Sequence, residues 1–101
     1  MKAHLDVQSP AFLVLESLPQ STAFGIIALF DYLQEFPEMG APLGPRFPKL
    51  KGLRQMIYKG SIRIIYEYDH LDETVYILAV QKCSQKMPDR RELKRRTPTS
   101  D

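Results

Sequence analysis

The residues of this chain that could do chemistry are cationic and aromatic. Neighbouring strands of a sheet lie about 5 Å apart, so cations on adjacent strands can reach one phosphate group. We expect Arg54, Arg63 and Lys82 to converge in this way. The alternative is that these side chains solubilise an open sheet face, since Lys and Arg are common on surfaces. The full group falls on, or at the ends of, three predicted strands: Arg54, Tyr58, Lys59, Arg63, Lys82 and Lys86.

A basic segment follows the last predicted strand. Residues 81–96, QKCSQKMPDRRELKRR, contain seven Lys and Arg against the two acids Asp89 and Glu92. The segment could be a solvated surface or a phosphate-binding one, and in the second case Arg90 and Arg91 would contact the nucleic acid. Pro88 and Asp89 suit the start of a helix, and cations suit its last turn. We therefore predict a short basic C-terminal helix.

The charge of the chain is separated along its length. Residues 1–45 carry one Lys and five acids, a net charge of −4, whereas residues 46–101 carry thirteen Lys and Arg and seven acids, a net charge of +6. Phosphate neutralisation supplies most of the sequence-independent affinity for nucleic acid. The second half is therefore the one expected to face an anion.

The sequence contains few other residue combinations that are typical of catalytic sites. His4 and His70 do not lie beside a Cys or another His at metal-ligand spacing, so no metal site is expected. No glycine-rich phosphate loop precedes a helix. Cys83 is the single cysteine, and the N-terminus lacks the order of a signal peptide, which together indicate a cytoplasmic protein. The longest apolar run, residues 23–30, is too short to span a membrane.

The elements that must position these residues follow from periodicity and turn signals. Apolar spacing of three and four residues predicts two helices, one with Phe12, Leu15 and Leu18 buried and one burying a stripe from Ile26 to Phe36. Four Pro and two Gly make residues 37–48 a loop. The predicted helices cover residues 9–18 and 21–36, and the predicted strands residues 2–8, 50–58, 62–68 and 74–82, the first at a sheet edge.

Strand parity assigns side chains to faces. On the middle strand of the predicted antiparallel meander, alternate residues Ile62 to Tyr68 share one face, and Arg63, Ile65 and Glu67 share the other. The second face is mixed and is expected to be half exposed. The fold class is thus α+β, with two N-terminal helices packed on a small antiparallel sheet. The length indicates a single domain, residues 1–96, and a flexible tail, residues 97–101.

Three motifs in order resemble the RelE/ParE toxin superfamily, and particularly its phage-derived HigB-like branch. They are the strand entry Leu50 to Gly52, the strand IRIIY at residues 62–66, and KCSQKMP at residues 82–88. The resemblance covers most of the chain up to Pro88.

The resemblance implies a toxin of a type II toxin–antitoxin pair. Such a toxin cuts mRNA on the ribosome without a cofactor, leaves a 2′,3′-cyclic phosphate end, and is neutralised by a cognate helix-turn-helix antitoxin. Arg63 matches the arginine of the strand motif and would stabilise the phosphate. Lys82 and Lys86 match the basic segment, Arg54 lies near a basic position, and Glu67 could act as general base.

Some positions depart from the family pattern and keep alternatives open. Gln55 stands where the branch has a glutamate, Ile57 where it has an arginine, and Cys83 where it has a lysine. They favour a second hypothesis, a non-catalytic module that binds RNA or a protein. A third is a ParE-like inhibitor of DNA gyrase, because one fold can host several functions.

Overall fold

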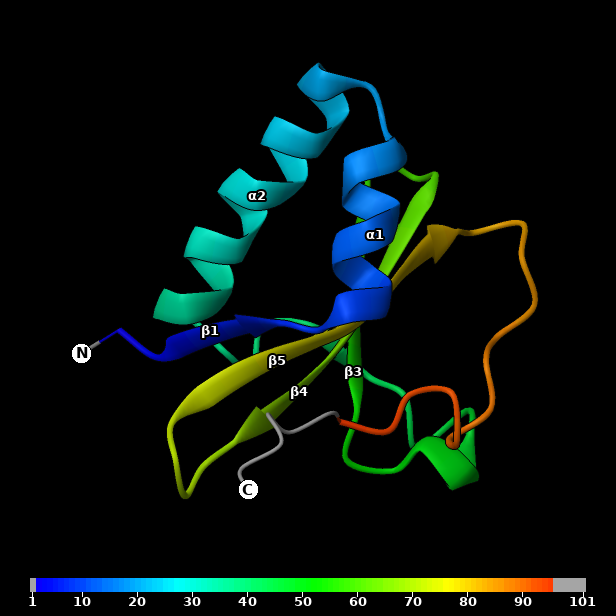
Figure 1. Cartoon of the computed structure of the whole chain (residues 1–101). Coiled ribbons are helices and arrows are strands. Elements are labelled where there is room, and N and C mark those ends of the chain that lie inside the picture. The colour runs from blue at the N-terminus through cyan, green and yellow to red at the C-terminus, as the bar shows by residue number, and fades with distance from the viewer. Residues whose placement is uncertain (1, 96–101) are drawn as a thin grey trace, which may run out of the picture.

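The computed structural model describes residues 2–95 and shows two helices on one face of a five-stranded sheet (Figure 1). No helix among these residues is long and apolar enough to cross a membrane. The α+β architecture agrees with the prediction. In chain order the elements are β1 His4–Val7, α1 Ser9–Ser17, α2 Gln20–Glu35, β2 Ala41–Pro42, the 3-10 helix η1 Pro48–Leu50, β3 Arg54–Tyr58, β4 Ile62–Asp69 and β5 Thr74–Lys82.

The sheet has the strand order β1-β5-β4-β3-β2. Strands β3, β4 and β5 form the predicted antiparallel meander, and β2 extends it on the β3 side. Strand β1 lies at the edge, as expected, but it pairs with β5 in parallel. The sheet is therefore mixed, because the helical hairpin returns the chain to the opposite end of the sheet before the meander begins.

Prolines set the boundaries of the helical hairpin. Pro10 occupies the first turn of α1, where its missing N–H costs no hydrogen bond, and Pro19 separates the two helices. The predicted stripe of α1 was partly wrong, since Ala11 and Leu15 are buried while Phe12 is exposed. The small Ala11 side chain lets α1 lie close to β5, and that rotates Phe12 outward. Phe36 is also exposed, because it lies one residue beyond the end of α2.

One hydrophobic core lies between the helices and the sheet. The alternate residues Ile62, Ile64 and Tyr66 of β4 pack there with Ile26 and Phe30 of α2. The predicted parity of β4 is therefore confirmed, and its Ile–Tyr face is the one that the helices cover. Burying these side chains supplies the main driving force for folding.

A second core covers the opposite face of the sheet. Ile65 of β4 is fully buried there, so this face is less open than predicted. The loop between α2 and β3 and the segment after β5 supply the cover through Leu43, Leu50, Leu53 and Leu93. A register shift between the pairs of Ile65 and Tyr66 leaves Leu78 of β5 without a partner on β4, and Leu78 packs in the same core.

The predicted basic C-terminal helix does not form within the described residues. Residues 90–93 make a turn, in which the Leu93 N–H donates to the Arg90 carbonyl oxygen over 3.1 Å. Leu93 is drawn into the second core, and Asp89 N–H is held by the Glu92 side chain. These tertiary anchors outweigh a helix that would bury only one or two side chains. Arg96 and the predicted tail lie outside the described residues.

Candidate nucleic-acid interface

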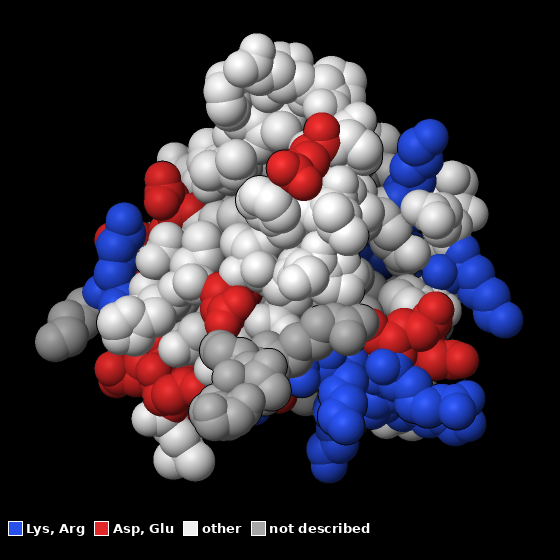
Figure 2. All heavy atoms as spheres, viewed as in Figure 1, with Lys and Arg blue, Asp and Glu red and all other residues white. Residues whose placement is uncertain are grey.

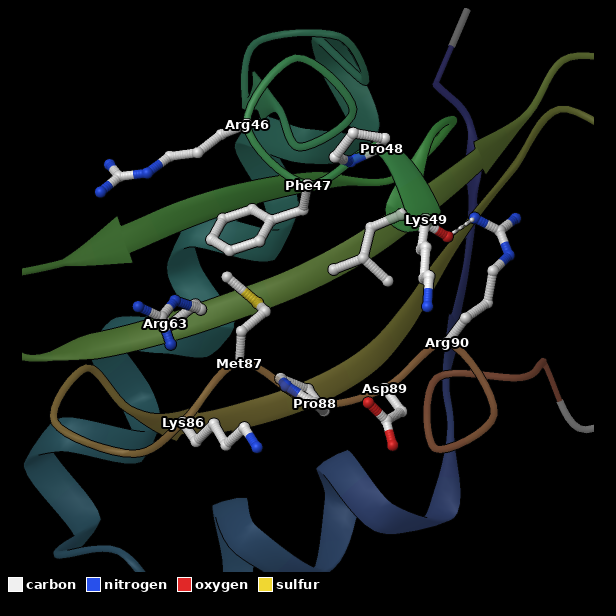
Figure 3. Close-up of a pocket in the computed structure, with 11 residues that line it drawn as sticks. Arg46, Phe47, Pro48, Lys49, Arg63, Lys86, Met87, Pro88, Asp89 and Arg90 are labelled. Carbon is white, nitrogen blue, oxygen red and sulfur yellow. Dashed lines mark hydrogen bonds between the residues drawn. The ribbon is translucent and has the colours of Figure 1, made fainter.

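A pocket of about 660 Å³ opens on the face of the sheet opposite the helices (Figure 3). Its floor includes Arg63 of β4. One wall is the loop that carries η1, and the other is the segment that follows β5. The lining residues are Arg46, Phe47, Pro48, Lys49, Leu50, Arg63, Lys86, Met87, Pro88, Asp89 and Arg90.

The two walls are tied together at one end by Arg90. Its Nη1 donates to the carbonyl oxygens of Lys49, over 3.1 Å, and Lys51, over 2.8 Å. These acceptors are neutral, so the guanidinium keeps its charge while it holds the loop to the C-terminal segment (Figure 3). Leu50 and Leu93 anchor the same two segments in the second core.

Arg63 is held in place by neutral partners. Its Nε donates to Gln55 Oε1 over 3.1 Å, and its Nη1 donates to Gln81 Oε1 over 2.8 Å. Gln55 lies on β3 and Gln81 on β5, so the strands on both sides orient the guanidinium. Among the described residues no carboxylate lies within 4.0 Å of it. A fixed guanidinium whose charge is not compensated is suited to a phosphate.

The pocket combines a cationic rim with an apolar interior. Five of its lining residues are Lys or Arg, against the single carboxylate of Asp89. Phe47 and Met87 point toward one another across the interior (Figure 3). Such a site can hold an anionic group beside a flat apolar one, the combination that a nucleotide presents.

The predicted convergence of Arg54, Arg63 and Lys82 is wrong. Arg54 pairs with Tyr66 and Lys82 pairs with Ile62, so both lie on the helix-covered face. Arg63 lies on the other face, with Gln55 and Gln81. Paired residues of neighbouring strands share a face, and an offset of one residue exchanges the faces. Of all the residues predicted to bind or cut RNA, only Lys86 and Arg90 line the pocket with Arg63.

Arg54 instead supports the loop after α2. Its Nη1 donates to the carbonyl oxygens of Glu38, over 3.1 Å, and Gly40, over 2.7 Å. Its Nη2 lies 3.9 Å from the Glu38 carboxylate. These contacts occupy the guanidinium with structural partners on the helix-covered face.

Glu67 shares the face of Arg63 but not its pocket. It lies four residues along β4, about 13 Å away at the rise of a strand. Its Oε1 is 3.9 Å from Nε of Arg95. Arg91 lines the same neighbouring hollow as Glu67, outside the Arg63 pocket. Glu67 is therefore not placed to act with Arg63.

Tyr58 and Lys59 lie at the turn between β3 and β4, away from the pocket. Tyr58 packs against the helix-side core, and its hydroxyl occupies the space beside Gly25 that an added Cβ would need. Lys59 Nζ lies 5.6 Å from the centre of the same ring. Neither residue lines the pocket around Arg63.

Arg95 fastens the C-terminal segment to the turn between β4 and β5. Its Nη1 donates to Asp69 Oδ2 over 3.0 Å, and its guanidinium lies 4.2 Å from the centre of the Tyr76 ring. The hydrogen bond from Arg95 lowers the pKa of Asp69. Tyr76 donates to Asp72 Oδ2 over 2.6 Å, and this bond raises the pKa of Tyr76.

Sequence reasoning missed Arg46, Phe47, Lys49 and Asp89 as pocket residues. The first three stand in the proline-rich loop, RFPK, where cations flank an aromatic residue, and this interleaving was the available signal. No cluster of three His, Cys, Asp or Glu side chains that could hold a metal ion occurs in residues 2–95.

The fold is similar to those of solved toxin structures. A chain of the toxin–antitoxin complex RelBE2 from Mycobacterium tuberculosis is 25% identical, with a TM-score of 0.70 over 81% of this chain and 99% of that one. A mutant of Escherichia coli RelE in the free state is 18% identical, with a TM-score of 0.68 over 83% and 86%. A chain of the RelE–RelB complex from Pyrococcus horikoshii is 18% identical, with a TM-score of 0.56 over 85% and 100%.

No protein-family model and no curated protein matches the sequence. The two helices on one face of a five-stranded sheet form an α+β fold like that of RelE. The likeness confirms the predicted resemblance to the RelE/ParE toxin superfamily. Placement in the HigB-like branch stays a prediction.

Proposed function

We propose that this protein is the toxin of a type II toxin–antitoxin pair, a ribosome-dependent endoribonuclease that cuts mRNA in the cytoplasm. The RelE fold supports the class, since similar structures come from complexes of RelE toxins with RelB antitoxins. The motifs in residues 50–88 favour the HigB-like branch. The proposal includes a cognate antitoxin as the natural partner.

The proposal rests mainly on one observation: among the described residues, no carboxylate lies within 4.0 Å of the Arg63 guanidinium. Arg63 is aimed by two glutamine side chains and opens into a pocket with four further cations, Arg46, Lys49, Lys86 and Arg90. Phosphoryl transfer with an internal nucleophile requires chiefly positioning and charge directed at the transition state. No cofactor is needed for such a reaction.

The reaction is a transesterification within the RNA. The 2′-oxygen attacks the adjacent phosphorus, its bond to phosphorus forms, and the bond from phosphorus to the 5′-oxygen breaks. Arg63 stabilises the charge that develops on the non-bridging oxygens. The proton of the 2′-hydroxyl passes to a general base, and Lys86, which lines the pocket with Arg63, donates a proton to the leaving 5′-oxygen. The products are a 2′,3′-cyclic phosphate and a 5′-hydroxyl.

Induced expression in a bacterium tests the proposal. The wild type should arrest growth, and primer extension should map cuts in translated mRNA. Arg63→Ala should reduce cleavage by about 100-fold or more, because a donor to the transition-state charge is lost. Arg91→Ala makes the same change in charge outside the pocket and should still arrest growth.

The other outcomes separate the alternatives. A wild type that is harmless at high expression, with intact mRNA, would overturn the nuclease. RNA binding without cleavage would identify a non-catalytic binding module. A DNA-damage response in place of mRNA cleavage would identify a gyrase inhibitor.

A further inference from the structure

The outer face of α2 exposes large apolar side chains beside acids. The outer face of α2 consists of residues spaced three or four apart along the helix, all of which are exposed: Gln20, Phe24, Ile27, Ala28, Asp31 and Glu35. Phe24 keeps 61% of its surface accessible and Ile27 keeps 48%. The opposite side of the helix already supplies Ile26, Phe30 and Leu33 to the core. The helix therefore has apolar side chains on two sides, and its buried residues all lie on the inner one.

The charge around this face is mostly negative. Between Lys2 and Arg46 the sequence contains no Lys or Arg, whereas Glu16, Asp31 and Glu35 all belong to the helical hairpin. Lys2 Nζ lies 4.0 Å from Asp31 Oδ1, and both side chains are exposed. No other cation in the described part of the chain comes within 4.0 Å of Asp31 or Glu35. Figure 2 shows the upper part of the molecule as a largely uncharged surface interrupted by acids, with the largest group of Lys and Arg at the lower right and others on both flanks.

The position of the acids within α2 points to a cationic partner. Asp31 and Glu35 lie in the last two turns of the helix, and its last turn contains no basic residue. The C-terminal end of a helix carries a partial negative charge, so acids there are disfavoured and cations are favoured. A bound Lys or Arg side chain would offset both the carboxylates and the helix dipole.

We propose that the outer face of α2 is the docking site for an amphipathic helix of a partner protein. That helix carries apolar side chains where it meets Phe24 and Ile27 and Lys or Arg where it meets Asp31 and Glu35. From Gln20 to Glu35 the face spans fifteen residues of rise, about 22 Å, which is enough for four turns of a partner helix. Identifying the partner as the antitoxin rests on the proposed function, but the chemistry of the site does not.

The site is separate from the cationic pocket. Helix α2 packs on the Ile62–Tyr66 side of the sheet, and the pocket opens on the side of Arg63 and Ile65. A partner on α2 can therefore hold the protein without filling the pocket. The helical hairpin of a second copy would bring acids and no Lys or Arg opposite Asp31 and Glu35, so charge repulsion disfavours pairing of two α2 faces.

Two synthetic peptides test the docking. Both are 18-residue helices with a leucine stripe, one flanked by Lys and the other by Glu at the same positions. Binding to the whole protein is measured by fluorescence anisotropy. The Lys peptide should bind at least about tenfold more tightly than the Glu peptide, and Phe24→Ala with Ile27→Ala should weaken it by about tenfold. Asp31→Asn with Glu35→Gln should reduce the preference for Lys.

Leu71→Ala is the matched control, because Leu71 is 98% exposed in the turn between β4 and β5, away from α2. It should leave peptide binding unchanged. Equal binding of both peptides, or undiminished binding to the Phe24→Ala, Ile27→Ala variant, would overturn the proposal. So would a dimer of the free protein that this variant disperses in sedimentation, because a second copy would then be the occupant.

Growth arrest separates this proposal from the proposed function. The Phe24→Ala, Ile27→Ala variant should arrest growth as the wild type does, since the pocket is untouched. If the wild type failed to arrest growth, the toxin assignment would fall while the peptide measurements would still decide the docking site.

Discussion

At the scale of single residues, three arginines of this protein differ in what surrounds them. Arg54 is held by carbonyl oxygens and by Glu38, and Arg95 by Asp69. Arg63 is held by the amide oxygens of Gln55 and Gln81. A carboxylate neutralises a guanidinium, whereas an amide only orients it. The neighbours, not the residue type, therefore make Arg63 the candidate for phosphate binding.

Gln81→Glu tests this distinction. The substitution keeps the shape of the side chain and places a carboxylate where Gln81 Oε1 now lies, 2.8 Å from Arg63 Nη1. The new ion pair should compete with phosphate and weaken binding of a short single-stranded RNA by about tenfold, because a close charge pair contributes 1–2 kcal/mol or more. Gln20→Glu adds the same charge on α2 and should have a much smaller effect. Equal losses in the two variants would contradict a local role for Arg63.

At the scale of elements, strand β4 organises both faces of the sheet. Its Arg63 serves the pocket, and its Tyr66 secures the start of the loop that supplies one pocket wall. The Tyr66 hydroxyl donates to the Pro37 carbonyl oxygen over 2.8 Å and accepts from the Gly40 N–H over 2.9 Å. Burial raises the pKa of Tyr66, so the hydroxyl keeps the proton that it donates. The loop then continues to Leu43 and Leu50 in the second core.

Tyr66→Phe should therefore destabilise the fold through the loop. The buried Gly40 N–H and the Pro37 carbonyl would lose their partner, which should lower the free energy of unfolding by about 1–3 kcal/mol. Urea denaturation followed by circular dichroism measures this change. Tyr68→Phe removes a hydroxyl two residues away that makes no hydrogen bond to a described residue, and it should cost much less. A loss in Tyr68→Phe as large as in Tyr66→Phe would contradict the argument.

At the scale of the whole molecule, the charge separation along the chain is partly kept in space. The helical hairpin on one side of the sheet carries acids and no Lys or Arg, and five Lys and Arg of the second half line the pocket on the other side. Association with RNA should therefore depend on salt, since each phosphate contact releases counterions.

The salt dependence of RNA binding is tested by measuring the affinity for a single-stranded RNA between about 50 and 200 mM salt. Arg46→Ala and Lys49→Ala should each reduce the slope of log affinity against log salt by about one, because each removes one phosphate contact. Lys2→Ala removes a cation from the helical side and should leave the slope unchanged. Unaltered slopes in both pocket variants would show that these cations do not contact RNA.

The sequence alone determined the helices, the meander and the faces of β4. Pro10 and Pro19 mark the helical hairpin, and the alternation from Ile62 to Tyr68 assigns one face to the core. These features are local, because helix and strand periods and proline geometry act within a few residues. The superfamily resemblance also followed from short motifs in order.

Only the tertiary structure decided which cations meet. Periodicity tells which residues of one strand share a face, but it does not tell which residue of the next strand lies opposite. The pairing of Arg54 with Tyr66, and of Lys82 with Ile62, therefore could not be known from either strand alone. Arg90 meets the carbonyl oxygens of Lys49 and Lys51, about forty residues earlier, because Leu50 and Leu93 pack in one core. The pocket exists through such long-range packing, which no local pattern encodes.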